Sequence, residues 1–292
     1  MSVIFGPGFG EKDLEAFKKV PVVSWQSGVP IKKEDADVVI VVGGDGTIHR
    51  HLPQLLELQL PVLIVPRGSG NDFARALNLD DVKHSLAAWQ KFLSGAGNVR
   101  LIDVGVIKSP ASNDSVQEHF FCTVAGVGID GEVARRANGL PRWLRGNGGY
   151  VFTLLPTIFQ FAPFLMKITL DGTTGPSREF GFRPTVLAAF ANVPSFGGGM
   201  KIAPQAQFDD GQLDVCVIRD IDKFKLFCVF PTVYFGRHLA LKEVEYSKAA
   251  SIRVETEHPF DIYADGEYVC QTPVEVSLRQ NALPVIVPWV RT

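Results

Sequence analysis

Cysteine is scarce in this sequence. The 292 residues include four cysteines, which lie far apart and form no Cys-x-x-Cys pair. This spacing excludes the common zinc-ligand patterns and the dense disulfide framework of small secreted domains. The N-terminal stretch MSVIFGPGFGEKD lacks a basic segment followed by an apolar run and a small-residue cleavage site, so we expect no signal peptide. Together these features predict a protein of the reducing cytoplasm.

An excess of charge of one sign is also missing. The formal net charge is −2, which excludes the basic field that broad nucleic-acid binding requires, so we expect no nucleic-acid partner. Residues 146–166 lack charged side chains, but Pro156 and Pro163 interrupt them. Because a membrane-spanning helix needs about 20 well-formed apolar residues, we interpret this stretch as a buried or interface-facing helix that is broken at the prolines.

The chain contains no internal repeat and no low-complexity tract, and its length predicts two domains. In residues 1–97, apolar runs alternate with helical spacing, which predicts an α/β domain with a parallel sheet. From residue 98 to 283, short strands separated by turns predict a mostly antiparallel, sandwich-like β domain. We expect the tail, residues 284–292, to pack back on the first domain. The strands expected in the first domain are 2–5, 21–25, 38–42 and 61–65, and its helices are 11–19, 48–58 and 73–77.

Residues 38–47 (VVIVVGGDGT) organise the first domain. An unbroken β-branched run indicates a strand that is buried on both faces. The glycines at its carboxyl end let backbone N–H groups approach a bound anion, and Asp45 places a carboxylate beside that anion. An Asp-Gly turn after a strand is a common feature on its own, so this motif alone leaves both interpretations open.

Residues 66–75 (PRGSGNDFAR) follow the next apolar run, 61–65. Two glycines flank a serine, and Asn71 and Asp72 are residue types that favour a helix N-cap. A glycine turn that opens a helix presents free N–H groups and a positive dipole end, which suits phosphate. A plain capped helix has the same pattern. However, two glycine-rich loops at adjacent strand ends favour a ligand site, because ligands of parallel sheets bind there.

Two further motifs in the second half contain carboxylates. Residues 208–215 (FDDGQLDV) carry two adjacent aspartates, and residues 263–268 (YADGEY) place Asp265 and Glu267 on either side of a glycine. Each of them alone is typical of an Asp-Gly hairpin turn.

Taken in order, residues 43–47, 66–75, 208–215 and 264–267 resemble the motifs of the diacylglycerol kinase catalytic-domain family. That family includes soluble bacterial lipid kinases, sphingosine kinases and ceramide kinases. GGDGT is shared with the NAD kinases, whereas GSGNDFAR is much more specific to lipid kinases. The resemblance implies ATP- and Mg²⁺-dependent transfer of the γ-phosphoryl group to a lipid hydroxyl, such as that of diacylglycerol, in a cleft between the two domains.

The resemblance also implies roles for individual residues. Asp45 would lie near the magnesium, and Asp265 or Glu267 would be the base that takes the proton from the lipid hydroxyl. Asp210 would belong to a structural metal site with the backbone carbonyls of Gln207 and Gln212. The residues implied to bind the nucleotide are Ser24, Gly43, Gly44, Asp45, Gly46, Thr47, Gly68, Ser69, Gly70, Asn71 and Asp72.

Two departures from the family pattern keep other functions open. His49 and Arg50 stand where the family usually has Asn-Glu, and only residues 5–8 occupy the place of an N-terminal nucleotide-contacting loop. One alternative is therefore a catalytically weak nucleotide- or lipid-binding regulatory protein. Another is an NAD kinase-like enzyme that acts on a soluble substrate, although the apolar residues 149–164 favour a lipid.

A basic segment suggests how a lipid would be reached. Residues 134–146 (ARRANGLPRWLRG) carry four arginines beside a tryptophan and a leucine. A solvated basic loop is one interpretation, and contact with an anionic membrane surface is the other, because each basic residue adds about 1 kcal/mol there. We expect a lipid substrate at a membrane surface, peripheral membrane association and a possible homo-oligomer.

Overall fold

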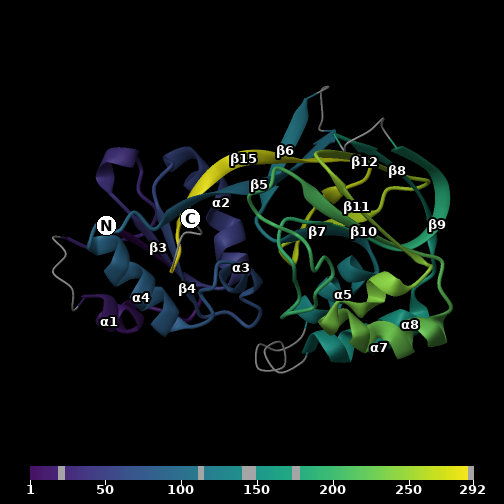
Figure 1. Cartoon of the computed structure of the whole chain (residues 1–292), viewed down its shortest axis with the longest axis horizontal. Coiled ribbons are helices and arrows are strands. Elements are labelled where there is room, and N and C mark those ends of the chain that lie inside the picture. Colours follow the sequence, from purple (N-terminus) through teal and green to yellow (C-terminus); the bar gives the residue numbers. More distant parts are fainter. Residues whose placement is uncertain (19–23, 111–114, 140–148, 173–177, 289–292) are drawn as a thin grey trace. The chain divides into compact units, whose positions relative to one another are not determined.

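The structure is a computed structural model that describes residues 1–18, 24–110, 115–139, 149–172 and 178–288 (Figure 1). The chain divides into two compact units. Unit 1 contains residues 1–103 and 280–292, and unit 2 contains residues 104–279. The strands β5 (Val99–Pro110) and β15 (Val274–Ile286) each contribute residues to both units.

Unit 1 is built on a parallel sheet. Its strands are β1 (Ser2–Phe5), β2 (Gln26–Ser27), β3 (Val39–Gly43) and β4 (Val62–Pro66), and the end of β15 pairs with β4. The order is β2-β1-β3-β4-β15, and each of these pairs is parallel. This confirms the α/β class predicted for the N-terminal domain. The strand predicted at 21–25 falls largely on residues outside the described ranges.

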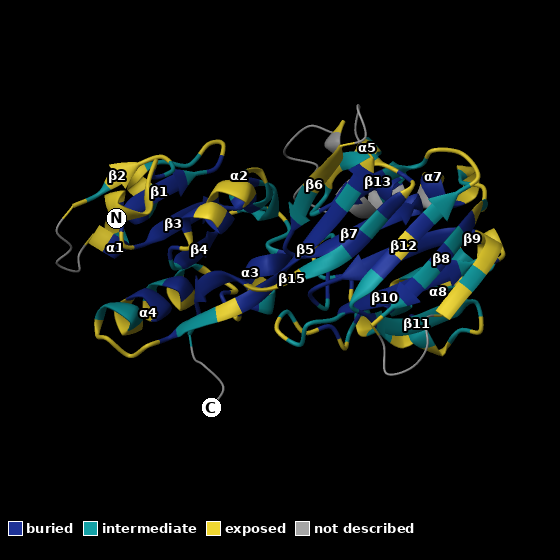
Figure 2. Ribbon diagram, turned by 90° about the horizontal axis from the view of Figure 1, so that it is seen from above, coloured by how far each residue is buried: buried dark blue, intermediate teal, exposed yellow. Residues whose placement is uncertain are grey.

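The middle strands of unit 1 form its core. Every residue of β3 and β4 is buried, and both strands are dark blue in Figure 2. Helix α4 (Val82–Leu93) packs on β4, where the buried Ser85 donates its hydroxyl to the carbonyl of Ile64 at 2.8 Å. The continuous β-branched runs thus form strands that are buried on both faces, as the sequence predicts. The remaining helices of unit 1 are η1 (Glu11–Leu14), α1 (Glu15–Lys18), η2 (Lys33–Asp35), α2 (Asp45–Leu58) and α3 (Asp72–Ala76).

Unit 2 is a mostly antiparallel β structure, as predicted. The path of hydrogen-bonded strands is β14-β13-β7-β9-β8-β12-β15, while β10 pairs with β9 and β11, and β6 pairs with β5. The strands are β6 (Val116–Phe121), β7 (Val124–Gly128), β8 (Phe164–Asp171), β9 (Arg178–Ala191), β10 (Leu213–Arg219), β11 (Val244–Ala249), β12 (Ser251–Thr256), β13 (Asp261–Ala264) and β14 (Glu267–Gln271).

Alternate residues of β9 and β10 pack into two separate cores. Ala188 and Phe190 belong to a core of strand residues, whereas Leu187 and Ala189 belong to a second core that also contains residues of α5 (Ile129–Asn138) and α7 (Gly149–Gln160). Since successive side chains of a strand point to opposite faces, both faces of these strands are covered. The second core continues into α8 (Lys223–Val229), η4 (Phe230–Phe235) and η5 (Arg237–Ala240).

Helix α7 corrects one expectation. The sequence predicted a break at Pro156, but α7 continues through this residue to Gln160. A proline removes one helical hydrogen bond and does not prevent the neighbouring ones. The next residue, Thr157, donates its hydroxyl to the carbonyl of Thr153 at 2.6 Å. The helix ends before Pro163, in agreement with the expectation for that residue. Among the described residues, no helix is long and apolar enough to cross a membrane.

Candidate active site

The GGDGT segment forms the junction between β3 and α2. Gly43 ends the strand, Gly44 is extended, and Asp45 opens the helix three residues earlier than predicted. A Cβ atom on Gly43 would lie 2.5 Å from the hydroxyl of Thr47, so this glycine is required by the local packing of the junction itself. The first N–H groups of a helix have no acceptor within it, and the dipole makes that end positive. The half-buried N-terminal end of α2 can therefore bind an anion.

The two glycine-rich loops touch each other through their backbones. A Cβ atom on Gly44 would lie 2.7 Å from the Cα of Gly68, and one on Gly68 would lie 2.5 Å from the Cα of Gly44. The loops therefore meet as the sequence predicted for adjacent strand ends. Asn71 closes the second loop, because its side chain accepts from the N–H of Gly68 at 2.8 Å and donates to the Gly68 carbonyl at 2.7 Å.

Asp45 caps α3 from the neighbouring loop. Its carboxylate accepts the backbone N–H of Asp72 at 3.0 Å and that of Phe73 at 3.1 Å. The glycine turn predicts free N–H groups at this helix, and that prediction is wrong for these two. Asn71, predicted as an N-cap, precedes the helix with φ of 54° and makes no side-chain cap. The cap comes from Asp45 because the contact between the loops brings its carboxylate to this helix end.

Of the remaining nucleotide-binding candidates, Asp72 and Ser69 lie in the second loop, whereas Ser24 lies at the amino end of β1, away from this contact. Asp72 is buried and forms an ion pair with Arg75 at 2.5 Å, whereas Ser69 is exposed. Ser24 is exposed too, and its carbonyl accepts from the N-terminal ammonium at 3.1 Å. A magnesium-bound phosphate would be held by the carboxylate of Asp45 and by the N–H groups at the N-terminal end of α2. Mg²⁺ takes oxygen ligands and keeps several waters. These residues fit the pair of cofactors that the resemblance implies.

In unit 2, Asp265 and Gly266 form the two-residue turn between β13 and β14. Both have positive φ, 53° and 85°, and Ala264 pairs with Glu267 across the turn. This is the geometry of a type I′ hairpin. The carboxylate of Asp265 accepts from the backbone N–H of Cys122 at 3.1 Å and of Thr123 at 2.8 Å. It also accepts the Thr123 hydroxyl at 2.5 Å.

The two carboxylates of the YADGEY motif are therefore placed differently. Both oxygens of Asp265 hold the segment between β6 and β7, which makes Asp265 a part of the local architecture. Glu267 is exposed at the start of β14. A base must reach the proton that it removes, and of the two side chains Glu267 is the accessible one.

An apolar cavity lies in the second core of unit 2. Its volume is 70 Å³, about twice the share of one water molecule in the liquid. The side chains around it come from β9, β10, β11, five helical segments and the loop 196–202. Leu226 of α8 and Val229, Phe230 and Tyr234 after it line one side, so these short helices separate the cavity from solvent.

Asp130 is the carboxyl group that faces this cavity. As a residue it is half-buried, but its Oδ1 is enclosed and has no hydrogen-bond partner among the described residues. Burial raises the pKa of Asp130 from 3.8 to about 7, against the lowering effect of the N–H groups of Gly131 and of Asp130 itself. A protonated carboxyl group in an apolar wall can donate a hydrogen bond to a ligand oxygen.

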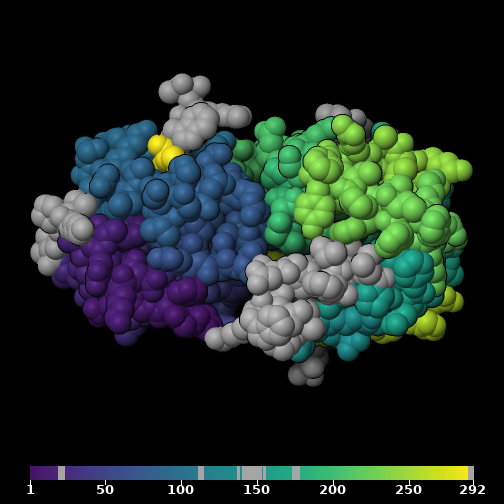
Figure 3. Space-filling model, turned by 90° about the horizontal axis from the view of Figure 1, so that it is seen from below, coloured from purple at the N-terminus to yellow at the C-terminus, as the bar shows by residue number. Residues whose placement is uncertain are grey.

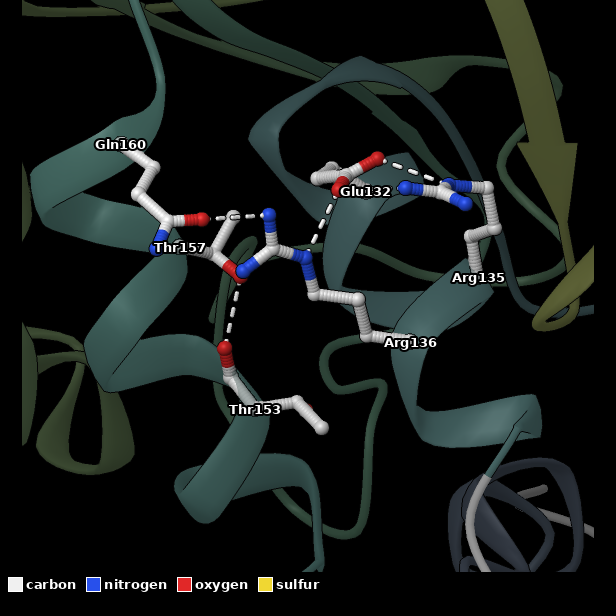
Figure 4. A network of polar contacts seen from close by, with 6 residues as sticks. All are labelled: Glu132, Arg135, Arg136, Thr153, Thr157 and Gln160. Carbon is white, nitrogen blue, oxygen red and sulfur yellow. Dashed lines mark hydrogen bonds and ion pairs between the residues drawn. The ribbon is translucent and has the colours of Figure 1, made fainter.

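The basic segment expected at a membrane is partly neutralised. Glu132 forms ion pairs with both Arg135 and Arg136 at 2.7 Å, and Arg136 also donates to Gln160 of α7 at 2.7 Å (Figure 4). These contacts tie α5 to α7. The other two arginines of the segment, at 142 and 145, lie outside the described residues.

The Asp210 turn does not offer an open metal site. Oδ1 of Asp210 accepts the N–H of Gln212 at 3.1 Å, and Oδ2 lies 2.5 Å from the ammonium of Lys248. Among the described residues, no group of three or more His, Cys, Asp or Glu side chains could hold a metal. A structural metal here, with Gln207 and Gln212 as further ligands, would have to bind beside an ammonium group. The residues of this turn do not fit that ion.

Three residues in these arrangements had no role in the sequence analysis. They are Thr123, Asp130 and Lys248. Asp130 stands between glycines in the segment GVGIDGE, and an aspartate in such an apolar context is a usable signal. Thr123 and Lys248 give no local signal, because their partners lie 142 and 38 residues away in sequence.

Comparisons with known proteins agree with this geometry. Residues 29–107 match the family model of the diacylglycerol kinase catalytic domain. Residues 123–287 match the model of the YegS C-terminal NAD kinase beta sandwich-like domain. The two models thus match the parallel α/β unit and the β-sandwich-like unit in turn.

Individual relatives give the same result. A diacylglycerol kinase of Mycobacterium tuberculosis (strain ATCC 25618 / H37Rv) is 36% identical over 252 residues, which cover 86% of this chain and 77% of the relative. A diacylglycerol kinase of Bacillus subtilis (strain 168) is 27% identical over 256 residues, covering 86% and 78%. The crystal structure of a diacylglycerol kinase from Bacillus anthracis str. Sterne has the same fold, with a TM-score of 0.66, 22% identity and coverage of 98% and 96%. The chain belongs to the diacylglycerol kinase family of lipid kinases.

Proposed function

We propose that this protein transfers the γ-phosphoryl group of ATP to the hydroxyl of a diacylglycerol-like lipid, with Mg²⁺ as the cofactor. Phosphoryl transfer requires mainly positioning and charge neutralisation, together with a base at the attacking oxygen. The end of α2 with Asp45 supplies the first requirement, because it offers N–H groups and a carboxylate within one loop. Family membership and the fit of these residues support the proposed use of both cofactors.

We assign the role of base to Glu267 and a positioning role to Asp265. Glu267 is exposed, whereas Asp265 accepts three hydrogen bonds from Cys122 and Thr123. Replacing Glu267 by Gln removes the proton acceptor and keeps the shape. We expect E267Q to lower kcat about 10²- to 10⁴-fold with an unchanged melting temperature. D265N is expected to lower the melting temperature as well. A kcat of E267Q close to that of the wild type would refute the assignment.

The observation that carries a lipid acceptor is the apolar cavity of unit 2. A soluble substrate gains nothing from a wall of aliphatic and aromatic side chains, whereas each buried CH₂ group of an acyl chain contributes about 0.8 kcal/mol. At 70 Å³ the cavity accommodates only a short apolar segment as it stands. Entry of a longer chain requires α8 and η4 to move outward, and no residue of α8 is buried.

A paired substitution on α8 tests the cavity. Leu226 faces the cavity, while Cys228 on the same helix is exposed. L226W fills the space, and we expect it to raise KM for long-chain diacylglycerol about tenfold and to affect a short-chain analogue less. C228W is the matched control and should leave both unchanged. Equal KM values for L226W and C228W on the long-chain lipid would contradict an acyl site in the cavity.

We also propose that the outer face of α7, α8 and η4 contacts the membrane. Phe159, Phe224, Phe227 and Phe235 are 50%, 68%, 39% and 75% exposed, and the Phe159 and Phe224 rings lie 5.9 and 6.5 Å from the Phe227 ring. Residues 223–242 lie on the surface of unit 2 in light green in Figure 3. The exposed cations Lys223, Arg237 and Lys242 accompany these rings. Aromatic side chains with basic neighbours are typical of interfacial segments.

Vesicle sedimentation tests this face. We expect F224S/F227S/F235S to lose binding to vesicles that contain anionic lipid. The matched control V116S/F182S removes two other exposed apolar side chains, 62% and 51% exposed, and should bind as the wild type does. Equal binding of both variants would refute the proposal for this face.

The activity itself is tested with labelled ATP, Mg²⁺ and a panel of lipids, with E267Q as the control. Label in a lipid that disappears with E267Q supports the kinase. Label in NADP instead would support the NAD kinase-like alternative. Nucleotide binding without any transfer would support a regulatory protein, for which His49 and Arg50 are the motivating observation.

A further inference from the structure

Four side chains form one polar cluster on β10, β11 and the turn before them. Lys248 lies 2.5 Å from Asp210 and 3.4 Å from Asp214, and the hydroxyl of Tyr246 donates to Asp214 at 2.5 Å. Asp214 is fully buried. The ammonium of Lys248 therefore bridges two carboxylates, one in the Asp210 turn and one inside the sheet.

The strand register creates this cluster. Asp214 and Lys248 are direct partners across the antiparallel β10–β11 pair, and Cys216 and Tyr246 are the next pair on the same face. Side chains at directly opposite positions lie about 4.5–5.5 Å apart at Cβ, so an opposite-charge pair there is held by the backbone. The lysine stem then continues past Asp214 to Asp210, which places its charge at the turn.

We propose that the ammonium of Lys248 is the built-in cation of the Asp210 turn and that it takes the place of a metal ion there. A divalent ion at this turn would need an oxygen of Asp210, and the Lys248 ammonium, 2.5 Å from Oδ2, already neutralises that carboxylate. A divalent ion and an ammonium a few ångströms apart repel each other strongly in a partly buried site. Two backbone carbonyls do not offset that repulsion for a hard cation.

The inference is independent of the proposed lipid kinase activity, because it concerns the stability of unit 2. It assigns any divalent-ion requirement of the enzyme to sites other than the Asp210 turn. It also explains how the carboxylate of Asp214 is accommodated in the sheet interior, since buried charges are normally paired.

The test is thermal unfolding of the full chain, without nucleotide, in EDTA and in millimolar MgCl₂ or CaCl₂. We expect the wild-type midpoint to be the same in all three. K248M keeps the stem and removes the charge, so its midpoint in EDTA should fall by about 5–10 °C. Because two carboxylates then lack a cation, K248M should regain part of the loss with increasing divalent ion, in a saturable manner.

Two matched variants complete the design. K248R retains a cation and should show no divalent response, and K242M removes an exposed lysine from the preceding loop and should behave as the wild type does. A K248M midpoint without any divalent response would overturn the proposal. If K248M does not fold, Mn²⁺ binding to the wild type and to D210N decides the question. A Mn²⁺ site present in the wild type and lost in D210N would also overturn it.

Discussion

At the scale of single residues, Asp45 has two roles to reconcile. Family resemblance assigns its carboxylate to magnesium, and in the structure the same carboxylate accepts two N–H groups of α3. A carboxylate has about four lone-pair positions, so one group can both cap the helix and face a metal-bound phosphate. In the proposed mode of binding, the nucleotide site and the order of the 68–72 loop are therefore linked through one side chain.

Substitution of Asp45 should therefore affect stability as well as binding. We expect D45A to destabilise the protein by about 1–2 kcal/mol, the usual effect of losing a helix cap. It should also speed amide hydrogen exchange at Asp72 and Phe73. The control S69A changes an exposed side chain of the same loop and should leave both quantities unchanged. Wild-type exchange rates in D45A would show that the cap is dispensable.

Asp130 predicts a dependence of stability on pH. Its folded pKa of about 7 lies above the ordinary 3.8, so between these values the unfolded chain releases a proton that the folded chain keeps. The contribution of Asp130 to the stability of the protein is therefore largest below pH 4 and falls as the pH rises to 7. Three pKa units correspond to about 4 kcal/mol at most, and the half-buried position reduces this to about 2–3 kcal/mol.

The measurement is the difference in unfolding free energy between the wild type and D130N from pH 4 to pH 8. Other titrating groups cancel in that difference. We expect the unfolding free energy of D130N, relative to that of the wild type, to increase steadily as the pH rises to 7 and to stay constant above pH 7. A difference that does not change with pH would mean that Asp130 titrates normally.

At the scale of elements, the junction between β7 and α5 depends on one glycine. Gly128 has φ of 126°, and an added Cβ would collide with the backbone carbonyl of Val186 on β9. Both the conformation and the close approach exclude a side chain. This junction directs α5, and with it Asp130, over the sheet.

We expect G128A to destabilise the protein by about 3 kcal/mol or more, because strain and collision add. Gly181 in β9 is the matched control, since it is exposed and an added Cβ meets no atom within 4 Å. G181A should change stability by less than about 1 kcal/mol. The measurement is the midpoint of urea unfolding of G128A and of G181A, each compared with that of the wild type. Similar values for both variants would refute the packing argument.

Continuous apolar runs were enough to predict β3 and β4, because such runs have few other stable arrangements. The α8–η5 segment was not predicted, since its apolar residues are split between a cavity wall and an exposed face and give no clear period. In the site, the contact between Gly44 and Gly68 followed from two adjacent strand ends. The cap by Asp45 and the Lys248 bridge did not, because each joins segments that only the tertiary fold brings together.

At the scale of the whole molecule, the chain returns to its beginning. Residues 280–292 belong to the same unit as residues 1–103. Leu283, Val285 and Ile286 of β15 are fully buried there, and Val285 pairs with Val62 of β4. Unit 1 is thus completed by a strand that follows all of unit 2 in the sequence.

A charged side chain at a buried position of β15 should destabilise unit 1. We expect V285D to cost about 3–5 kcal/mol, as an unpaired buried charge does, and to remove hydrogen-exchange protection from β3 and β4. Q280D, at an exposed position of the same strand, is the control and should leave protection intact. Protection lost only from strands of unit 2 would contradict the prediction.

The contact between Gly44 and Gly68 has a consequence for how such a protein can change over generations. Because each glycine leaves room for the backbone of the other, a methyl group on either one separates the two loops, and the first replacement bears nearly the whole cost. The second then adds little, so the two losses are strongly sub-additive. Neither glycine can be replaced first without this loss, so we expect related enzymes to retain both.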